Sequence, residues 1–344
     1  MIRFECDYQE GAHPLILKRL MDTNWEQTSG YGEDVFCENA RNIIRKICEN
    51  HLLDIHFLVG GTQTNTTVIA SILKPYQGVI AADCGHINVH ETGAIESTGH
   101  KVIALDSING KISAEQVETY YNKHWNDANH EHIVQPGMVY ISQPTELGTL
   151  YSKSELMTLY SVCQRLNLPL YIDGARLGYA LMSPENTISI NDLAKLCDVF
   201  YIGGTKIGAL FGEAIVIVNE NLKKDFRYMI KQRGALLAKG RILGLQFETL
   251  LKDNLYFQIA KHAIDMAMLI QKAFIEKHIK LHVLSPTNQQ FPILTRQQKD
   301  TLAQKYAFEL WENINDDTFI VRFCTSWATK EEHVKALIDD IKKL

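Results

Sequence analysis

The chain has 344 residues, which suits one large α/β domain with a smaller one, or two domains of comparable size. Hydrophobic residues make up 46% of it and charged residues 22%, and these ordinary globular values exclude a disordered chain. The formal net charge is −5 without a long block of like charges, so we expect no nucleic-acid partner. No apolar run approaches the roughly 20 residues of a membrane span, and the N-terminal residues lack an apolar signal core.

The seven cysteines stand singly, and no two of them have CxxC spacing. This pattern argues against a disulfide framework and against a zinc site, so no metal is expected. We therefore expect a reduced protein of the cytoplasm without contact to a membrane.

Up to residue 250 the sequence alternates short β-rich runs with longer helical patterns. Several of the runs are almost wholly apolar, as expected of parallel strands that are covered on both faces. This alternation predicts a mainly parallel sheet with right-handed crossovers. Strands are predicted at 55–59, 79–83, 102–105, 138–142, 168–172, 199–203 and 214–218, and helices at, for example, 153–167 and 191–197.

The C-terminal part follows a different pattern. A long helix is predicted at about 256–278 and a final helix, with one apolar face, at about 330–343. Short strands are predicted near 280–284, 290–294 and 319–323. We therefore predict a large α/β domain at 15–250 and a smaller α+β domain at 251–344, with residues 1–14 packing near the latter.

Two reactive side chains follow predicted strands. Asp173 stands at a strand end in YIDGAR, and ligands of open α/β sheets bind outside the carboxyl ends of the strands. Lys206 ends the run YIGGTK, where glycines allow close approach and apolar neighbours surround the amine. Desolvation lowers the pKa of a lysine, which makes it a nucleophile able to form an imine. Each residue alone also has a plain explanation, as a turn-capping acid and as a lysine that extends to solvent.

Two further motifs point to a ligand. In LVGGTQTN a strand runs into Gly61 and Thr62, and a helix is expected to begin near Asn65. Backbone N–H groups at such a junction bind anions, although the GxxxxGK[ST] pattern of an ATP phosphate loop is missing. His86, in GHINVHETGA, follows another strand end, where its ring could lie on a cofactor or simply begin a helix.

The ordered set GGTQTN, GHINVHETGA, DGARL and TK resembles enzymes of the aspartate aminotransferase fold that use pyridoxal 5′-phosphate (PLP). More narrowly, it resembles the threonine aldolase and β-eliminating lyase family (fold type I). The resemblance extends over nearly the whole chain, from DYQEGAHP at 7–14 through YGED at 31–34 to IVRF at 320–323. It implies a PLP-binding large domain with a mainly parallel sheet and a smaller α+β C-terminal domain.

The resemblance also implies roles for the candidate residues. Lys206 would form the imine with PLP and move protons on the substrate, and Asp173 would pair with the pyridine nitrogen, which keeps the ring an electron sink. His86 would stack on the ring. The phosphate would bind to Gly61 and Thr62, with Thr205 as a helper and Lys231 and Arg233 as weaker candidates. Arg176, beside the cofactor, and Arg322 would grip the carboxylate of an amino acid substrate, because a guanidinium matches a carboxylate with two hydrogen bonds. Without the resemblance, Arg322 reads as a residue of an edge strand.

The family implies aldol cleavage of a β-hydroxy amino acid, threonine or allo-threonine, to glycine and an aldehyde. The substrate hydroxyl must then lose a proton, for which His86 and Glu146 are the candidate bases. Glu146, in SQPTELGTL, falls about where many members have a histidine, and the early segment in which they commonly offer a serine reads ECDYQEG here, with Cys6 nearby. Both departures leave the substrate less defined than the cofactor.

Several alternatives remain open. β-Elimination, which gives a keto acid and ammonia, would use the same cofactor residues, and a racemase or transaminase has less support. A non-catalytic PLP-fold binding protein would not need both Lys206 and Asp173. A nicotinamide-dependent enzyme is set aside, because the first strong strand leads into GGTQTN and not GxGxxG. The resemblance further implies a homodimer, or a tetramer formed from two dimers.

Overall fold

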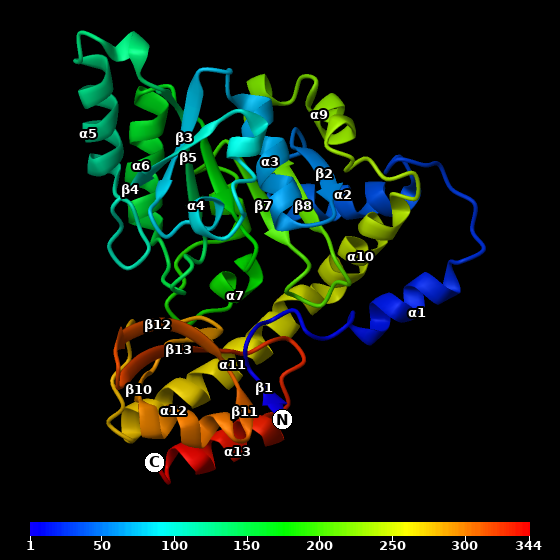
Figure 1. The fold of residues 1–344 in the computed structure, drawn as a ribbon. Helices are drawn as coiled ribbons and strands as arrows, with labels where there is room; N and C mark the ends of the chain where they lie inside the picture. Colours follow the sequence, from blue (N-terminus) through cyan, green and yellow to red (C-terminus); the bar gives the residue numbers. More distant parts are fainter.

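The computed structural model describes all residues, 1–344, and is built around a seven-stranded sheet (Figure 1). The strand order is β2-β8-β7-β6-β5-β3-β4, and only β8 is antiparallel to its neighbours β2 and β7. The strands are β2 (Asp54–Leu58), β3 (Gln77–Ala82), β4 (Lys101–Leu105), β5 (Gln135–Ser142), β6 (Leu170–Asp173), β7 (Val199–Gly203) and β8 (Glu213–Ile217). The seven predicted strands and the mainly parallel α/β architecture are therefore confirmed, with strand ends that differ by a few residues.

Helices cover both faces of this sheet. Tyr171 and Tyr201 point to one face, where they pack in a cluster with residues of α3 (Gly61–Ile72), α4 (His86–Val89) and α9 (Phe226–Gln232). Their strand neighbours Ile172 and Phe200 point to the other face. The helices on that face are α2 (Val35–Ile47), α5 (Ala114–Trp125), α6 (Lys153–Arg165), α7 (Leu177–Leu181), α8 (Ile190–Leu193) and α10 (Arg241–Leu251). Because both faces are buried, the central strands are apolar at successive positions.

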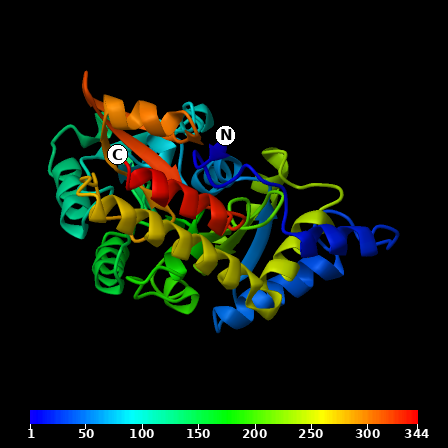
Figure 2. The same cartoon turned by 90° about the horizontal axis from the view of Figure 1, so that it is seen from below.

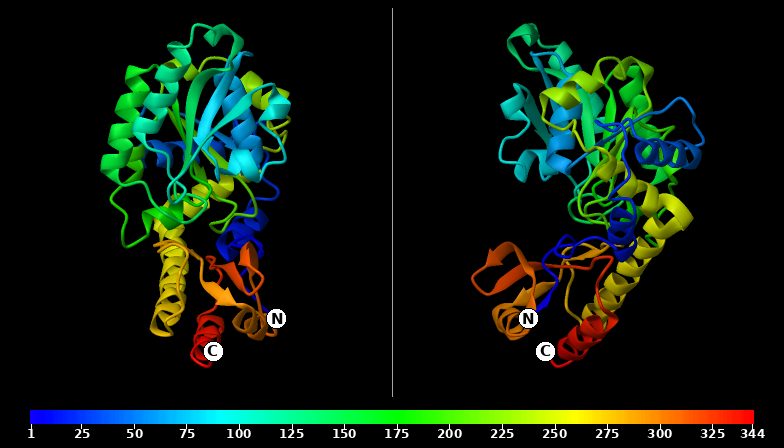
Figure 3. Two further views of the ribbon diagram at one scale, coloured as in Figure 1. Left: turned by 60° about the vertical axis from the view of Figure 1, so that its left-hand side comes forward. Right: turned by 90° about the vertical axis from the view of Figure 1, so that its right-hand side faces the viewer.

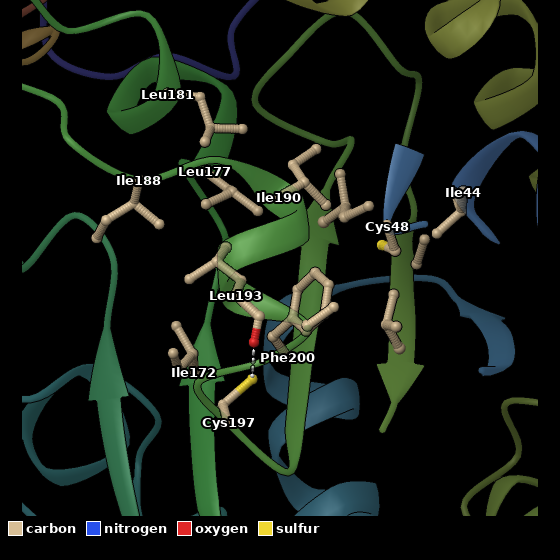
Figure 4. Close-up of a cluster of buried hydrophobic side chains, with 14 of the residues drawn as sticks. Ile44, Cys48, Ile172, Leu177, Leu181, Ile188, Ile190, Leu193, Cys197 and Phe200 are labelled. Carbon is tan, nitrogen blue, oxygen red and sulfur yellow. Dashed lines mark hydrogen bonds between the residues drawn. The ribbon is translucent and has the colours of Figure 1, made fainter. Parts of the chain in front are cut away.

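Figure 4 shows the second face around Ile172 and Phe200. Leucines and isoleucines of α7 and α8 pack onto these strand residues, and Ile44 and Cys48 lie near the α2 side of the cluster. The Cys197 thiol donates a hydrogen bond to the backbone oxygen of Leu193 at 3.1 Å. All seven cysteines are free thiols in the structure, and the two shown in Figure 4, Cys48 and Cys197, belong to the apolar core.

Short 3₁₀ helices lie in several of the connections. They are η1 (Glu96–Thr98), η2 (His130–His132), η3 (Glu220–Leu222) and η4 (Lys252–Asn254).

No helix of the structure combines the length and the apolar character that crossing a membrane requires.

A long helix, α11 (Leu255–Glu276), runs from the large sheet to the C-terminal part of the chain (Figures 1 and 3). That part has a small antiparallel sheet in the order β10-β13-β12, and α13 runs beside α11 (Figure 2). Its elements are β9 (Gln289–Gln290), β10 (Ile293–Thr295), α12 (Arg296–Ala303), β11 (Tyr306–Ala307), β12 (Glu309–Asn315), β13 (Thr318–Cys324) and α13 (Glu331–Ile341). The predicted long and final helices are confirmed.

The two ends of the chain meet in this C-terminal part. Strand β1 (Ile2–Arg3) pairs in parallel with β11, and Phe4 packs against Phe323 in the local apolar cluster. The division of the chain between residues 250 and 251 stays a prediction. Helix α1 (Pro14–Asp22) lies at one edge of the molecule in Figures 1 and 2.

Two local predictions were wrong. Residues 280–284 form no strand, and only an isolated bridge joins Leu281 to Pro292. Two backbone hydrogen bonds of 2.8 Å make this bridge, from the N–H of His282 to the oxygen of Phe291 and from the N–H of Ile293 to the oxygen of Lys280, and no further pair extends it into a strand. Helix α3 begins at Gly61 and not near Asn65, because Gly60 holds an extended backbone (φ −171°) and acts as the N-cap.

Candidate active site

A cavity of about 180 Å³ lies where the carboxyl ends of β5, β6 and β7 approach the start of α3. This position agrees with the general location of ligand sites in open α/β sheets. Its wall contains eight of the predicted site residues, namely Gly61, Thr62, His86, Glu146, Asp173, Arg176, Thr205 and Lys206. The structure thus brings together motifs from five separate stretches of the sequence.

Asp173 is held by four hydrogen-bond donors. One carboxylate oxygen accepts from the hydroxyl of Tyr140 at 2.6 Å and from the side-chain amide of Asn65 at 3.2 Å. The other accepts from the hydroxyl of Tyr201 at 2.5 Å and from the backbone N–H of Ala175 at 2.9 Å. These contacts fix the carboxylate in one orientation, and it is almost wholly buried.

The strand register explains how the tyrosines reach this acid. Tyr140 and Tyr171 are opposite each other in β5 and β6, and Ser142 is opposite Asp173. Since side chains alternate along a strand, a residue two positions before a strand end points to the same face as the strand-end residue. Burial, and then the charge of Asp173, raise the pKa of Tyr140 and of Tyr201 well above 10. Both hydroxyls therefore remain donors to the carboxylate.

Asn65 connects two carboxylates. The hydroxyl of Tyr171 donates to its amide oxygen at 2.7 Å, which orients the amide nitrogen toward Asp173 and toward Glu91, at 2.7 Å. The carboxylate of Glu91 is itself fully buried. A single amide thus ties the acid at the end of β6 to the acid that follows α4.

His86 is the first residue of α4 and faces the cavity. Its Nδ1 lies 2.7 Å from the same Glu91 oxygen, and its backbone N–H donates to Glu146 at 2.8 Å. With Glu91 ionised, the proton of a neutral imidazole resides on Nδ1, and Nε2 is then free to accept a proton.

Glu146 lies in the loop after β5 and contacts the backbone of His86, whereas Glu91 contacts its ring. One of the Glu146 oxygens accepts from the His86 backbone and from the Ser142 hydroxyl, at 2.7 Å, which leaves the second oxygen for a ligand. Burial raises the pKa of this carboxyl. A carboxyl group with a raised pKa is suited to exchanging a proton near neutral pH.

Lys206 follows β7 in a turn that several contacts fix. The hydroxyl of Tyr179 donates to the backbone oxygen of Lys206 at 2.6 Å, and the Thr205 hydroxyl donates to Glu213 at 2.8 Å. Burial, and then the charge of Arg176, lower the pKa of the Lys206 amine. Burial likewise raises the pKa of Glu213 to about 8. An amine with a lowered pKa is a better nucleophile at neutral pH.

The start of α3 can bind an anion at the same cavity. Gly60, Gly61 and Thr62 all lie in its wall, and no side chain caps this helix end. The first N–H groups of the helix thus have no partner in the helix itself. A side chain at Gly61 would place its Cβ 3.3 Å from the hydroxyl of Tyr201, so glycine keeps this approach open.

The two candidate arginines are both engaged by acids of the chain. Arg176 contributes Nε and Nη2 to the carboxylate of Asp7, at 2.7 and 2.9 Å. Burial alone would raise the pKa of Asp7, but the charges of Arg176 and Lys206 outweigh it and lower the pKa to about 2. The side-chain amide of Asn288 donates to the same carboxylate at 2.9 Å.

Arg322 lies outside the cavity wall, on β13. It donates to the side chain of Gln289 at 2.9 Å and to the backbone of Glu5 at 3.1 Å, and it forms an ion pair with Glu309. Its reading as an edge-strand residue is wrong, because β13 is flanked by β10 and β12.

Several site residues were not predicted from the sequence. Tyr140 and Glu213 touch the cavity or its acids without belonging to a marked motif, and Asn65 and Tyr201 lie in the motifs GGTQTN and YIGGTK but were assigned no role in the site. The signal that could have found the tyrosines is their position two residues before a strand end. Cys6, Lys231 and Arg233 are not in the cavity wall: Lys231 lies over the ring of Tyr31, and the backbone oxygen of Arg233 accepts from Gln63.

The family of the chain follows from comparison with known proteins. The beta-eliminating lyase family matches residues 15–296, and the chain belongs to this family. The expected resemblance to the threonine aldolase and β-eliminating lyase family is thereby confirmed, and the chain is a lyase.

Individual relatives extend over almost the full length. A low specificity L-threonine aldolase of Pseudomonas sp. is 29% identical over 343 residues, which are 99% of this chain and 97% of the relative. The structure of a Leishmania major threonine aldolase is 43% identical, with a TM-score of 0.97, and covers 100% of this chain and 99% of its own. An aspartate aminotransferase structure from Thermus thermophilus shares only 13% identity at a TM-score of 0.72, over 100% of this chain and 91% of its own, and confirms the aspartate aminotransferase-like fold.

Proposed function

We propose that the chain is a PLP-dependent lyase that cleaves the Cα–Cβ bond of a β-hydroxy amino acid, threonine or allo-threonine, to glycine and an aldehyde. The observation that carries this proposal is one cavity that combines the Lys206 amine with the fixed Asp173 carboxylate. The 43% identity to the Leishmania major threonine aldolase, over the whole chain, supports the same reaction class.

The residues of the cavity fit PLP. The start of α3, with Gly61 and Thr62, suits its phosphate, because free N–H groups of a helix end bind anions. Asp173, with four donors around it, suits a cationic ring nitrogen, and Lys206 suits covalent attachment. When bound, PLP supplies an electron sink for the charge that develops at Cα. The Thr205 hydroxyl already contacts Glu213, so its help with the phosphate has less support.

His86 and Glu146 would handle the proton of the substrate hydroxyl. Both lie in the cavity wall, and the backbone N–H of His86 donates a hydrogen bond to the carboxylate of Glu146. We propose that His86 stacks against the ring of the cofactor, with Nε2 or the free Glu146 oxygen accepting the proton. Arg176 and Arg322 are proposed to hold the substrate carboxylate.

The assembly is proposed to be a homodimer or a tetramer. Helix α1 and the residues after it present exposed apolar side chains that the chain itself does not cover: Leu15, Leu17, Met21 and Trp25, the last with 91% of its surface exposed. Exposed apolar patches of this kind mark association surfaces. Light scattering after gel filtration tests this, since Met21→Glu with Trp25→Glu should yield monomers if a second copy covers the surface. The cytoplasmic location stays a prediction.

The proposed function is tested by release of aldehyde from L-threonine and from L-allo-threonine by purified protein supplied with PLP. We expect acetaldehyde and glycine, and neither with Lys206→Ala. No aldehyde from any β-hydroxy amino acid would refute the proposal. Pyruvate from serine would then identify β-elimination, which the threonine aldolase relatives do not favour.

A further inference from the structure

The ion pairs of Arg176 and Arg322 raise the question of where a substrate carboxylate would bind. Arg176 is joined to Asp7 by two hydrogen bonds, and Arg322 is paired with Glu309. A substrate carboxylate can reach the bonded edge of either guanidinium only if the internal acid leaves.

The two pairs differ in how far they are buried. The side chain of Asp7 is 0% exposed and that of Arg176 13%, whereas Glu309 is 42% exposed opposite an Arg322 that is 10% exposed. Removing one partner of a buried pair leaves an uncompensated charge and is strongly unfavourable. The Oε2 atom of Glu309 that faces Arg322 is itself buried, but the rest of the Glu309 side chain reaches solvent, so this carboxylate can move into water when it leaves. An ion pair with one partner near the surface contributes less than a fully buried one. Glu309 is therefore the acid that a ligand can displace.

Arg322 also has donors that the chain does not use. Its Nε, and the side-chain nitrogen of Gln289 beside it, are buried without a hydrogen-bond acceptor. A buried donor without an acceptor is costly, and a carboxylate with several lone pairs would satisfy such donors. The surroundings of Arg322 thus favour a carboxylate ligand.

A chain of aromatic contacts links Arg322 to the cavity. The ring of His86 lies 5.7 Å from that of His90, and His90 lies 6.2 Å from Trp311. The guanidinium of Arg322 lies over the Trp311 ring at 5.4 Å. Trp311 and Glu309 are on the same strand, β12, and Glu309 is directly opposite Arg322 in the register with β13.

We propose that Glu309 sets the affinity of this enzyme for amino acids by competing with the ligand carboxylate for Arg322. The proposal rests on the proposed function, in which Arg322 holds the substrate carboxylate. In the free enzyme Glu309 pairs with Arg322, and the α-carboxylate of an amino acid replaces it. Glu309 acts on binding, so its removal lowers Kd and KM and leaves kcat unchanged.

The test compares Glu309→Gln with Glu312→Gln in the holoenzyme. Glu312 is an exposed acid of the same strand, so its variant controls for the change in net charge. Glycine binding is measured by calorimetry beside glycine methyl ester, which lacks the carboxylate. We expect glycine to bind about two- to fivefold tighter to Glu309→Gln, the range of an ion pair with an exposed partner, and the ester to bind equally to all variants.

The possible outcomes separate cleanly. Unchanged glycine affinity in Glu309→Gln, or an equal gain for the ester, overturns the proposal. So does unchanged glycine affinity in Arg322→Lys, because the contested arginine is then not the carboxylate site. Glu309→Ala, with a melting temperature equal to that of the parent, should reproduce the gain if Gln disturbs the strand. A gain that is present without aldehyde release would support the inference and refute the aldolase function.

Discussion

Asp7→Asn should destabilise the protein strongly, because the side chain of Asp7 is fully buried. The substitution keeps the shape of the side chain but leaves the buried charge of Arg176 without its counter-ion. Breaking a buried ion pair in this way costs about 3–5 kcal/mol. The lowering of the Asp7 pKa from 3.8 to about 2 corresponds by itself to about 2 kcal/mol in favour of the folded state. We expect a loss near 3 kcal/mol, because the amide oxygen of asparagine still accepts one hydrogen bond.

Urea unfolding at neutral pH measures this loss, with Asp22→Asn as the matched control. Asp22 pairs with Lys18 on the surface of α1, where the two side chains are 48% and 69% exposed. That pair should be worth less than about 1 kcal/mol. Equal losses in the two variants would refute the reasoning from burial.

The effect of Asp7→Asn on stability should also depend on pH. The pKa of Asp7 is lower in the folded than in the unfolded chain, so its stabilising contribution is present above about pH 4 and is lost as the pH falls toward about 2. The difference in unfolding free energy between the parent and Asp7→Asn should therefore shrink over this range. A difference that stays constant would show that the ionised carboxylate is not its source.

Three further substitutions probe the cavity and the turn that follows Asp173. Glu146→Gln removes a proton acceptor and should lower kcat for aldehyde release by about 10²–10⁴-fold, and unaffected cleavage would exclude Glu146 as the base. Tyr201→Phe removes one hydrogen bond to the Asp173 carboxylate, and such a bond is worth about 1.5–3 kcal/mol. Equilibrium dialysis should therefore find PLP binding at least about tenfold weaker. Equal affinity would contradict the role of Tyr201 in holding the carboxylate. Gly174→Ala would place a Cβ 1.8 Å from the backbone oxygen of Tyr201 and should sharply lower the melting temperature, whereas Gly11→Ala, with no atom within 4 Å, should not; similar melting temperatures would show that the loop yields.

The sheet could be predicted from sequence because burial on both faces leaves an unbroken apolar run in each central strand. Strand β12 was missed because most of its residues are exposed and polar, so neither an apolar run nor a strict alternation marks it. Helix α3 was placed too late because its start depends on the backbone of Gly60, which the residue type alone does not specify.

The site could be predicted where a motif marks a strand end, as with Asp173 and Lys206. For Tyr140 and Tyr201, the position two residues before a strand end predicts the face of the sheet, but their contact with Asp173 depends on the register of neighbouring strands, which pairs residues far apart in sequence. The pairing of Arg176 with Asp7 was hidden for the same reason. Only the folded chain brings the N-terminal segment beside α7.

The pairing of β1 with β11 constrains the order in which parts of this enzyme can fold during synthesis. Residues 2–3 leave the ribosome long before their partners, residues 306–307. The strands of the large sheet, which end at Ile217, are complete long before that, and domains generally fold as they emerge. The segment that carries Asp7 thus waits for its sheet partner until residues 306–307 have emerged, and only then is the acid that pairs with Arg176 in the cavity wall held in place from both sides of its segment.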